Sequence, residues 1–78
     1  MRKKTLKLVV AFHTTSEAMA MEKICMEQNV PGRLIPLPTA ISAGCGLAWC
    51  AELQDRELIE RVMGASGITK EDIYECML

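Results

Sequence analysis

The chain has 78 residues, a formal net charge of −1, and one each of Trp, Tyr and Phe. This length is enough for one small domain, residues 1–78, and leaves no room for a separate catalytic domain. Nucleic-acid-binding proteins usually show a basic excess and aromatic side chains for stacking on bases. Because the chain has neither, we expect no nucleic-acid partner.

The N-terminal segment has basic residues before an apolar run at residues 8–12, in the manner of a signal peptide. The polar segment 13–17 ends that run, which is too short for an export signal or a membrane span. We therefore expect a cytoplasmic protein with no membrane partner. In that reducing compartment, cysteines are more often thiols, metal ligands or transient redox groups than structural disulfides; the four are Cys25, Cys45, Cys50 and Cys76.

The first predicted elements are a strand and a helix. Residues 6–12 are apolar and rich in β-branched side chains, which is typical of a buried central strand. Thr14 and Glu17 have the spacing of a capping box, so a helix should begin directly after that strand. The Pro31–Gly32 pair predicts that the helix ends near Asn29.

Two further strands are predicted in the middle of the chain. Residues 33–37 indicate an edge strand, because Pro36 and Pro38 cannot donate ladder hydrogen bonds. A loop over residues 39–46 follows it. Residues 47–53 alternate in size, which predicts a third strand whose larger side chains are buried, namely Leu47, Trp49, Ala51 and Leu53.

The last predicted elements are a helix and a closing strand at residues 73–77. Asp55 is the expected N-cap of the helix, and Gly64 and Gly67 are expected to end it. Its apolar stripe consists of Leu58, Ile59, Val62 and Met63. The resulting order, βαββαβ, predicts an α+β ferredoxin-like sandwich with two helices on one face of a four-stranded antiparallel sheet.

This topology has two consequences for the arrangement of the residues. The third strand lies antiparallel between the first two, so Cys45 and His13 should meet at one end of the sheet, beside the start of the first helix. The face of the sheet without helices should be uncovered and partly apolar, which predicts a homodimer through that face. The residues expected on it are Val9, Ala11, Ala48 and Cys50.

Cys45 is the candidate reactive residue, because Gly44 and Gly46 flank it and leave its backbone free to bend. A helix N-terminus lowers the pKa of a nearby thiol. We therefore predict a sulfur- or selenium-binding site at the corner where this loop meets the first helix, formed by Gly44, Cys45, Gly46, His13, Thr14 and Thr15. The alternative for Cys45 is a tight-turn residue without chemistry.

The other candidate residues also have structural alternatives. Cys50 is either a half-exposed sheet cysteine or a resolving thiol. Five residues of extended chain span roughly 16 Å, too far for a disulfide between Cys50 and Cys45 unless the loop folds back. Cys25 and Cys76 are interpreted as core filling. His13 either orients or deprotonates Cys45, or is an exposed residue at a strand end. Neither a resident metal nor a cofactor is expected, because the cysteines and the histidine lack metal-ligand spacing.

The segments "FHTTSEAMAMEK" and "NVPGRLIPLPTAISAGCGLAW", with the short closing strand, resemble the selenium or sulfur carrier-like protein family. The resemblance covers nearly the whole chain and is most specific from Pro36 through Ser42-x-Gly44-Cys45-Gly46. It implies that Cys45 holds a persulfide or selenopersulfide, received from a donor such as a cysteine desulfurase and passed to an acceptor enzyme. The alternative function is a non-catalytic ferredoxin-like binding or assembly module, and whether the chain is itself an enzyme is left open.

Overall fold

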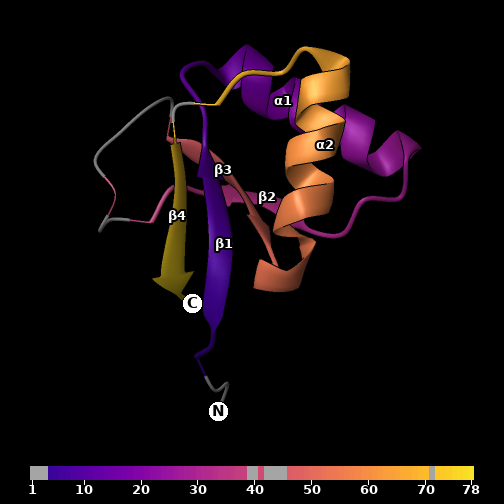
Figure 1. Cartoon of the computed structure of the whole chain (residues 1–78). Helices are drawn as coiled ribbons and strands as arrows, with labels where there is room; N and C mark the ends of the chain where they lie inside the picture. The colour runs from indigo at the N-terminus through magenta and orange to yellow at the C-terminus, as the bar shows by residue number, and fades with distance from the viewer. Residues whose placement is uncertain (1–3, 39–40, 42–45, 71) are drawn as a thin grey trace.

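The computed structural model describes residues 4–38, 41, 46–70 and 72–78 of the chain. Its elements confirm the predicted order βαββαβ, with one additional 3₁₀ turn before the second helix. Both helices lie on the same face of the sheet (Figure 1). The elements are β1 (Leu6–Ala11), α1 (Thr15–Glu27), β2 (Arg33–Pro36), β3 (Leu47–Ala51), η1 (Leu53–Asp55), α2 (Arg56–Ser66) and β4 (Asp72–Met77).

The four strands form one sheet in the order β2-β3-β1-β4, and all neighbouring strands are antiparallel. The third strand therefore lies between the first two, as the ferredoxin-like prediction requires. Ala11, the last residue of β1, is paired with Ala48 near the start of β3 and with Asp72 at the start of β4. The end of β1 and the starts of β3, β4 and α1 consequently share one end of the sheet (Figure 1).

Helix α1 begins as the sequence predicts, because Thr14 and Glu17 form a complete capping box. The Glu17 N–H donates to Thr14 Oγ1 at 3.2 Å, and the Thr14 N–H donates to Glu17 Oε1 at 3.2 Å. The helix ends at Glu27, and Asn29 then takes a left-handed conformation with a φ of 56°. That conformation turns the chain toward β2.

Helix α2 differs from its prediction at both ends. Asp55 occupies the N-cap position but its side chain makes no capping hydrogen bond, because the 3₁₀ turn η1 leads directly into the helix. Gly64 lies inside the helix, whereas Gly67 ends it with a left-handed φ of 71°. Of the predicted apolar stripe, Leu58 is exposed, while Ile59, Val62 and Met63 are buried against the core.

The main core lies between the sheet and the two helices. Its fully buried side chains include Leu8, Val10 and Phe12 from the first predicted strand and Met21 from α1. Cys25 belongs to this core and is 1% exposed, which confirms that it fills space there. Burial of these apolar side chains is the main force that holds the helices on the sheet.

The other face of the sheet is also covered, and the prediction that it would be exposed is wrong. Val9, Ala11 and Ala48 are fully buried within the single chain, and Cys50 is only 9% exposed. A second apolar cluster covers this face, because Leu37 and Ile41, which follow β2 in the sequence, pack on it. Ile41 is buried in this cluster, and its partly buried members are Ile35, Leu37, Tyr74 and Cys76. These residues therefore offer no exposed apolar patch on which the predicted homodimer could form.

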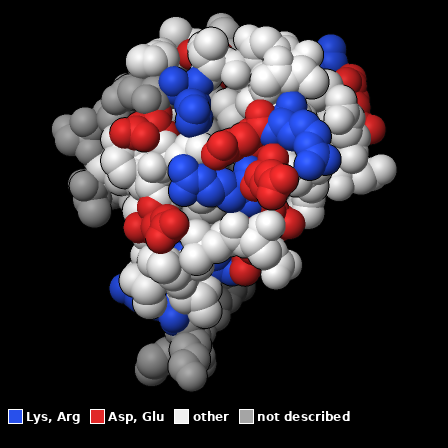
Figure 2. All heavy atoms as spheres, viewed as in Figure 1, with Lys and Arg blue, Asp and Glu red and all other residues white. Residues whose placement is uncertain are grey.

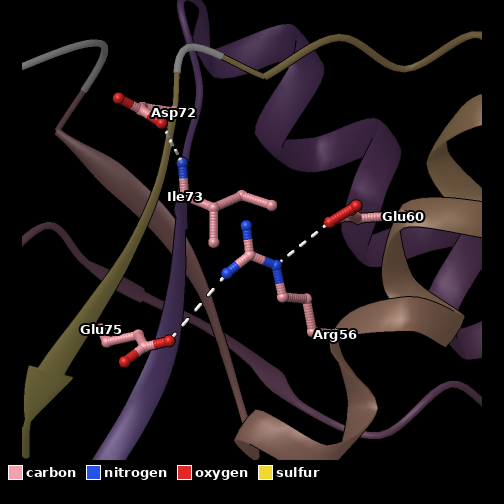
Figure 3. A network of polar contacts seen from close by, with 5 residues as sticks. All are labelled: Arg56, Glu60, Asp72, Ile73 and Glu75. Atoms are coloured by element: carbon pink, nitrogen blue, oxygen red, sulfur yellow. Dashed lines mark hydrogen bonds and ion pairs between the residues drawn. The ribbon is translucent and has the colours of Figure 1, made fainter.

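The surface over α2 carries charges of both signs that pair with one another (Figure 2). Arg56 Nε lies 3.1 Å from Glu60 Oε2 on the same helix, and Arg56 Nη1 lies 3.9 Å from Glu75 Oε2 on β4 (Figure 3). Arg61 pairs with Glu57 in the same way, at 3.7 Å. These pairs are exposed, so each contributes little to stability.

Candidate functional site

The predicted site lies at the end of the sheet where β1 finishes and β3 begins. Gly46 directly precedes β3, and His13 follows β1, so the pairing of Ala11 with Ala48 brings both to this end. Thr14 and Thr15 also lie there, as the N-cap and first residue of α1. Gly44 and Cys45 lie outside the described residues, so their places in the site remain predictions.

Gly46 has a conformation that only glycine adopts easily. Its φ is +86°, and a Cβ placed on it would meet nothing within 4 Å. Its carbonyl oxygen accepts a hydrogen bond from the Leu37 N–H at 2.8 Å, which ties the two ends of the connection between β2 and β3 together. Gly46, which follows Cys45 in the sequence, thus has a left-handed conformation and no neighbouring atoms where a side chain would begin.

The N-terminus of α1 is less available to an external anion than the sequence suggests. The Glu17 N–H, in the first turn of the helix, already donates to Thr14 Oγ1. Any helical partner of the Thr15 and Ser16 N–H groups would lie before the N-cap, so these two donors remain for an external acceptor. The α1 end of the site therefore presents two backbone donors.

Glu17 places a negative charge at this corner. Its carboxylate accepts hydrogen bonds from the Thr69 hydroxyl and from Thr14. The Thr69 hydrogen bond is the main reason why the pKa of Glu17 is lowered. Desolvation is the next largest effect and opposes this shift, whereas the Thr14 hydrogen bonds and the nearby His13 lower the pKa further. An ionised carboxylate thus already offsets part of the positive end of the helix.

The contact between Glu17 and Thr69 joins α1 to the connection between α2 and β4. The capping-box pattern identifies Glu17, but Thr69 is 52 residues away and no local pattern points to it. His13 is exposed and lies close enough to Glu17 to affect its pKa. Whether His13 orients or deprotonates Cys45 stays a prediction.

The described cysteines differ in their surroundings. Burial raises the pKa of the Cys25 thiol to about 11. Burial also raises the pKa of Cys50, against the opposing effect of the positive charges on Arg33 and Lys7. Cys50 is therefore a buried thiol and not a half-exposed one. Cys76 is half-buried and packs against the second apolar cluster, which agrees with its interpretation as core filling.

Disulfide formation between Cys50 and Cys76 does not fit the sheet. Cys50 is paired with Val9 and Cys76 with Lys7, so strand β1 separates the two cysteines. Two strand spacings amount to about 9–10 Å, which exceeds the Cα–Cα limit of about 7 Å for a disulfide. Cys50 also lies within the extended strand β3, and the estimated span between Cys45 and Cys50 assumes an extended chain.

Two other kinds of feature, a metal-binding cluster and a membrane-spanning helix, are absent from the described part of the chain. Over residues 4–38, 41, 46–70 and 72–78, no group of three or more His, Cys, Asp or Glu side chains is arranged to hold a metal ion. Within that same part of the chain, no helix has the length and apolar character needed to cross a membrane.

Comparison with known proteins gives one finding. The sequence model of a protein family described as "Putative Se/S carrier protein-like" matches residues 7–75. Neither the curated proteins nor the solved structures yield a match to the chain. The matched segment runs from β1 into β4 and includes the loop with the predicted reactive cysteine. On the strength of this match across nearly its whole length, the chain belongs to the Se/S carrier protein-like family.

Proposed function

We propose that the protein carries a sulfur or selenium atom on Cys45 as a persulfide or selenopersulfide. It would receive this atom from a donor such as a cysteine desulfurase and pass it to an acceptor enzyme in the cytoplasm. The observation that supports the proposal best is the open, left-handed Gly46. This glycine adjoins Cys45 in the sequence and lies at the α1 end of the sheet.

The proposed cycle consists of two exchanges at sulfur. In loading, the Cys45 thiolate attacks the outer sulfur of a donor persulfide, a new S–S bond forms on Cys45, and the donor leaves as a thiolate. In unloading, a thiolate of the acceptor attacks the outer sulfur on Cys45 in the same way. Each exchange breaks one S–S bond and forms another, so no external oxidant or reductant is needed.

The start of α1 supports this chemistry to a limited extent. A thiolate or persulfide is an anion, and the Thr15 and Ser16 N–H groups are available donors at the positive end of the helix. An interaction of this kind contributes about 0.3–1 kcal/mol. The Glu17 carboxylate opposes it, so we expect the pKa of Cys45 to lie below the reference value of about 8.5 by a small amount only.

The other thiols are poorer candidates for the carrier residue. A sulfur nucleophile must be a thiolate, and burial keeps Cys25 and Cys50 in the neutral thiol form. Cys76 is half-buried in the second apolar cluster. Cys45 is therefore the cysteine that we assign to the carrier role, together with Gly44 and Gly46 as the residues that present it.

The proposal is tested by mass spectrometry of the intact protein after incubation with a cysteine desulfurase and cysteine. The wild-type protein should gain the mass of one sulfur atom, and Cys45→Ser should gain none. Cys50→Ser and Cys76→Ser are matched controls that each remove one other thiol, and both should still be loaded. A Cys45→Ser protein that gains as much sulfur as the wild type would contradict the assignment. Absence of loading in the wild type would favour the binding or assembly module.

A further inference from the structure

A pocket of about 300 Å³ lies at the start of β2, beside the end of β3. The residues that matter for its chemistry are Lys7, Arg33, Cys50 and Glu52. The strand register places Lys7, Arg33 and Cys50 on the face opposite the helices, since Arg33 is paired with Cys50, Cys50 with Val9, and Val9 lies two residues from Lys7. This pocket belongs to the N-terminal end of β2, whereas the predicted Cys45 site adjoins the start of β3.

The rim of the pocket is held in place by close packing. Pro31 and Gly32 form this rim, and the Pro31 carbonyl oxygen accepts a hydrogen bond from Trp49 Nε1 at 3.3 Å. Gly32 has a φ of +126°, and a Cβ placed on it would lie 2.7 Å from the Cys50 carbonyl oxygen and closer still to Trp49 Nε1. The backbone that leads into Arg33 is thus fixed against β3.

The pocket contains one positively charged side chain, Arg33, whose charge is not offset by an ion pair among the described residues. Lys7 Nζ forms an ion pair with Glu52 Oε2, so these two charges offset each other. Among the described residues, Arg33 has neither a salt bridge nor a side-chain hydrogen bond, although it lies near enough to Cys50 to lower its pKa. The three charged side chains together carry one net positive charge. A ligand that satisfies this pocket should therefore be an anion.

The Cys50 thiol adds a second kind of contact. Because burial keeps it protonated, it is a weak hydrogen-bond donor and a soft, polarisable surface, and it is a poor nucleophile. Soft surfaces of this kind pack well against a sulfur or selenium atom. Arg33 provides the stronger polar contact, because a guanidinium group is a rigid fork of hydrogen-bond donors that matches the oxygen atoms of an oxyanion.

We propose that this pocket binds a small oxyanion that contains sulfur or selenium, with Arg33 on its oxygen atoms and Cys50 against its chalcogen atom. The choice of a chalcogen rests on the proposed function, whereas the net positive charge of the pocket requires only an anion. Thiosulfate is the probe that tests both parts. Sulfate is its matched control, because it has the same charge and shape but an oxygen in place of the outer sulfur.

The experiment is a titration of the full ¹⁵N-labelled chain, followed by amide chemical shifts at constant ionic strength. Thiosulfate should cause saturable shifts at Gly32, Arg33 and Cys50, and should bind more tightly than sulfate. Arg33→Gln should weaken binding by about tenfold or more, because it removes a charge-assisted hydrogen bond. Arg61→Gln is the matched control, since Arg61 is exposed on α2, which packs on the other face of the sheet (Figure 1). It should bind as the wild type does.

Three results would overturn the proposal. Shifts that do not saturate, or an equal loss of binding in Arg33→Gln and Arg61→Gln, would show that no anion site exists here. Equal affinity for thiosulfate and sulfate would refute the contact with Cys50. The same titration on Cys45→Ser should show unchanged binding, because that variant keeps Arg33 and Cys50, which make the proposed contacts. A failure of sulfur loading on Cys45 would therefore leave the outcome of this experiment unaffected.

Discussion

Replacement of Gly32 by alanine should destabilise the protein strongly, although it adds a single methyl group. The added Cβ would lie 2.7 Å from the Cys50 carbonyl oxygen, and the φ of +126° is one that alanine rarely adopts. Backbone strain of this kind costs about 1–3 kcal/mol, and overpacking costs about 1–3 kcal/mol more. The shift that relieves the clash would also disturb the hydrogen bond from Trp49 to Pro31. We therefore expect a loss of about 2–6 kcal/mol in the free energy of unfolding.

Urea unfolding followed by tryptophan fluorescence measures this loss, because the only tryptophan of the chain, Trp49, lies at the affected contact. Gly64→Ala is the matched control. Gly64 lies inside α2 and a Cβ on it would meet nothing within 4 Å, so alanine should stabilise the helix by about 0.5–1 kcal/mol. If Gly32→Ala were as stable as the wild type, the close approach of this turn to β3 would be refuted.

Two other predictions concern titratable groups. In the native protein, Cys45 should be alkylated first and Cys25 last, because burial raises the pKa of Cys25 to about 11; mass mapping of the alkylated cysteines checks this, and early reaction of Cys25 would contradict it. The lowered pKa of Glu17 means that its stabilising effect is complete above its unfolded-state pKa and is lost as the pH falls through its folded-state pKa. Thr69→Val, which removes the main cause of that shift, should therefore destabilise the protein at about pH 7 and much less at about pH 3. Urea unfolding at both pH values measures the difference, and an equal loss at both would argue against the carboxylate as the cause.

The order of the elements could be predicted because each boundary has a local chemical cause. The capping box at Thr14 and the turn residues before Arg33 act on their immediate neighbours, so the sequence alone reveals where α1 begins and β2 starts. The family resemblance seen in the sequence is confirmed by the family match over residues 7–75. Each strand agrees with its predicted bounds at one end and differs from them by one or two residues at the other.

The cover on the second face of the sheet could not be predicted in this way. Alternation along β1 and β3 shows which side chains share a face, but it does not show what packs on them. The covering segment follows β2, and its apolar Leu37 and Ile41 are the only local signal that it returns to the sheet. The contact between Glu17 and Thr69 could not be predicted for the same reason, because it depends on how two segments distant in the sequence meet in space.

The burial of Cys25 and Cys50 matters for the proposed function because of the way in which a persulfide reacts with other thiols. A second thiolate can attack the inner sulfur of a persulfide, which forms a disulfide and releases hydrosulfide, so the transferable atom is lost. A protein that carries a persulfide must therefore keep its other thiols neutral or out of reach. Cys25 is sealed in the main core, and Cys50 is buried in an extended strand beside cations that do not overcome the effect of burial on its pKa. Cys25 and Cys50 are thus compatible with the carrier role proposed for Cys45, because their burial suppresses the reactivity that would release the transferable atom.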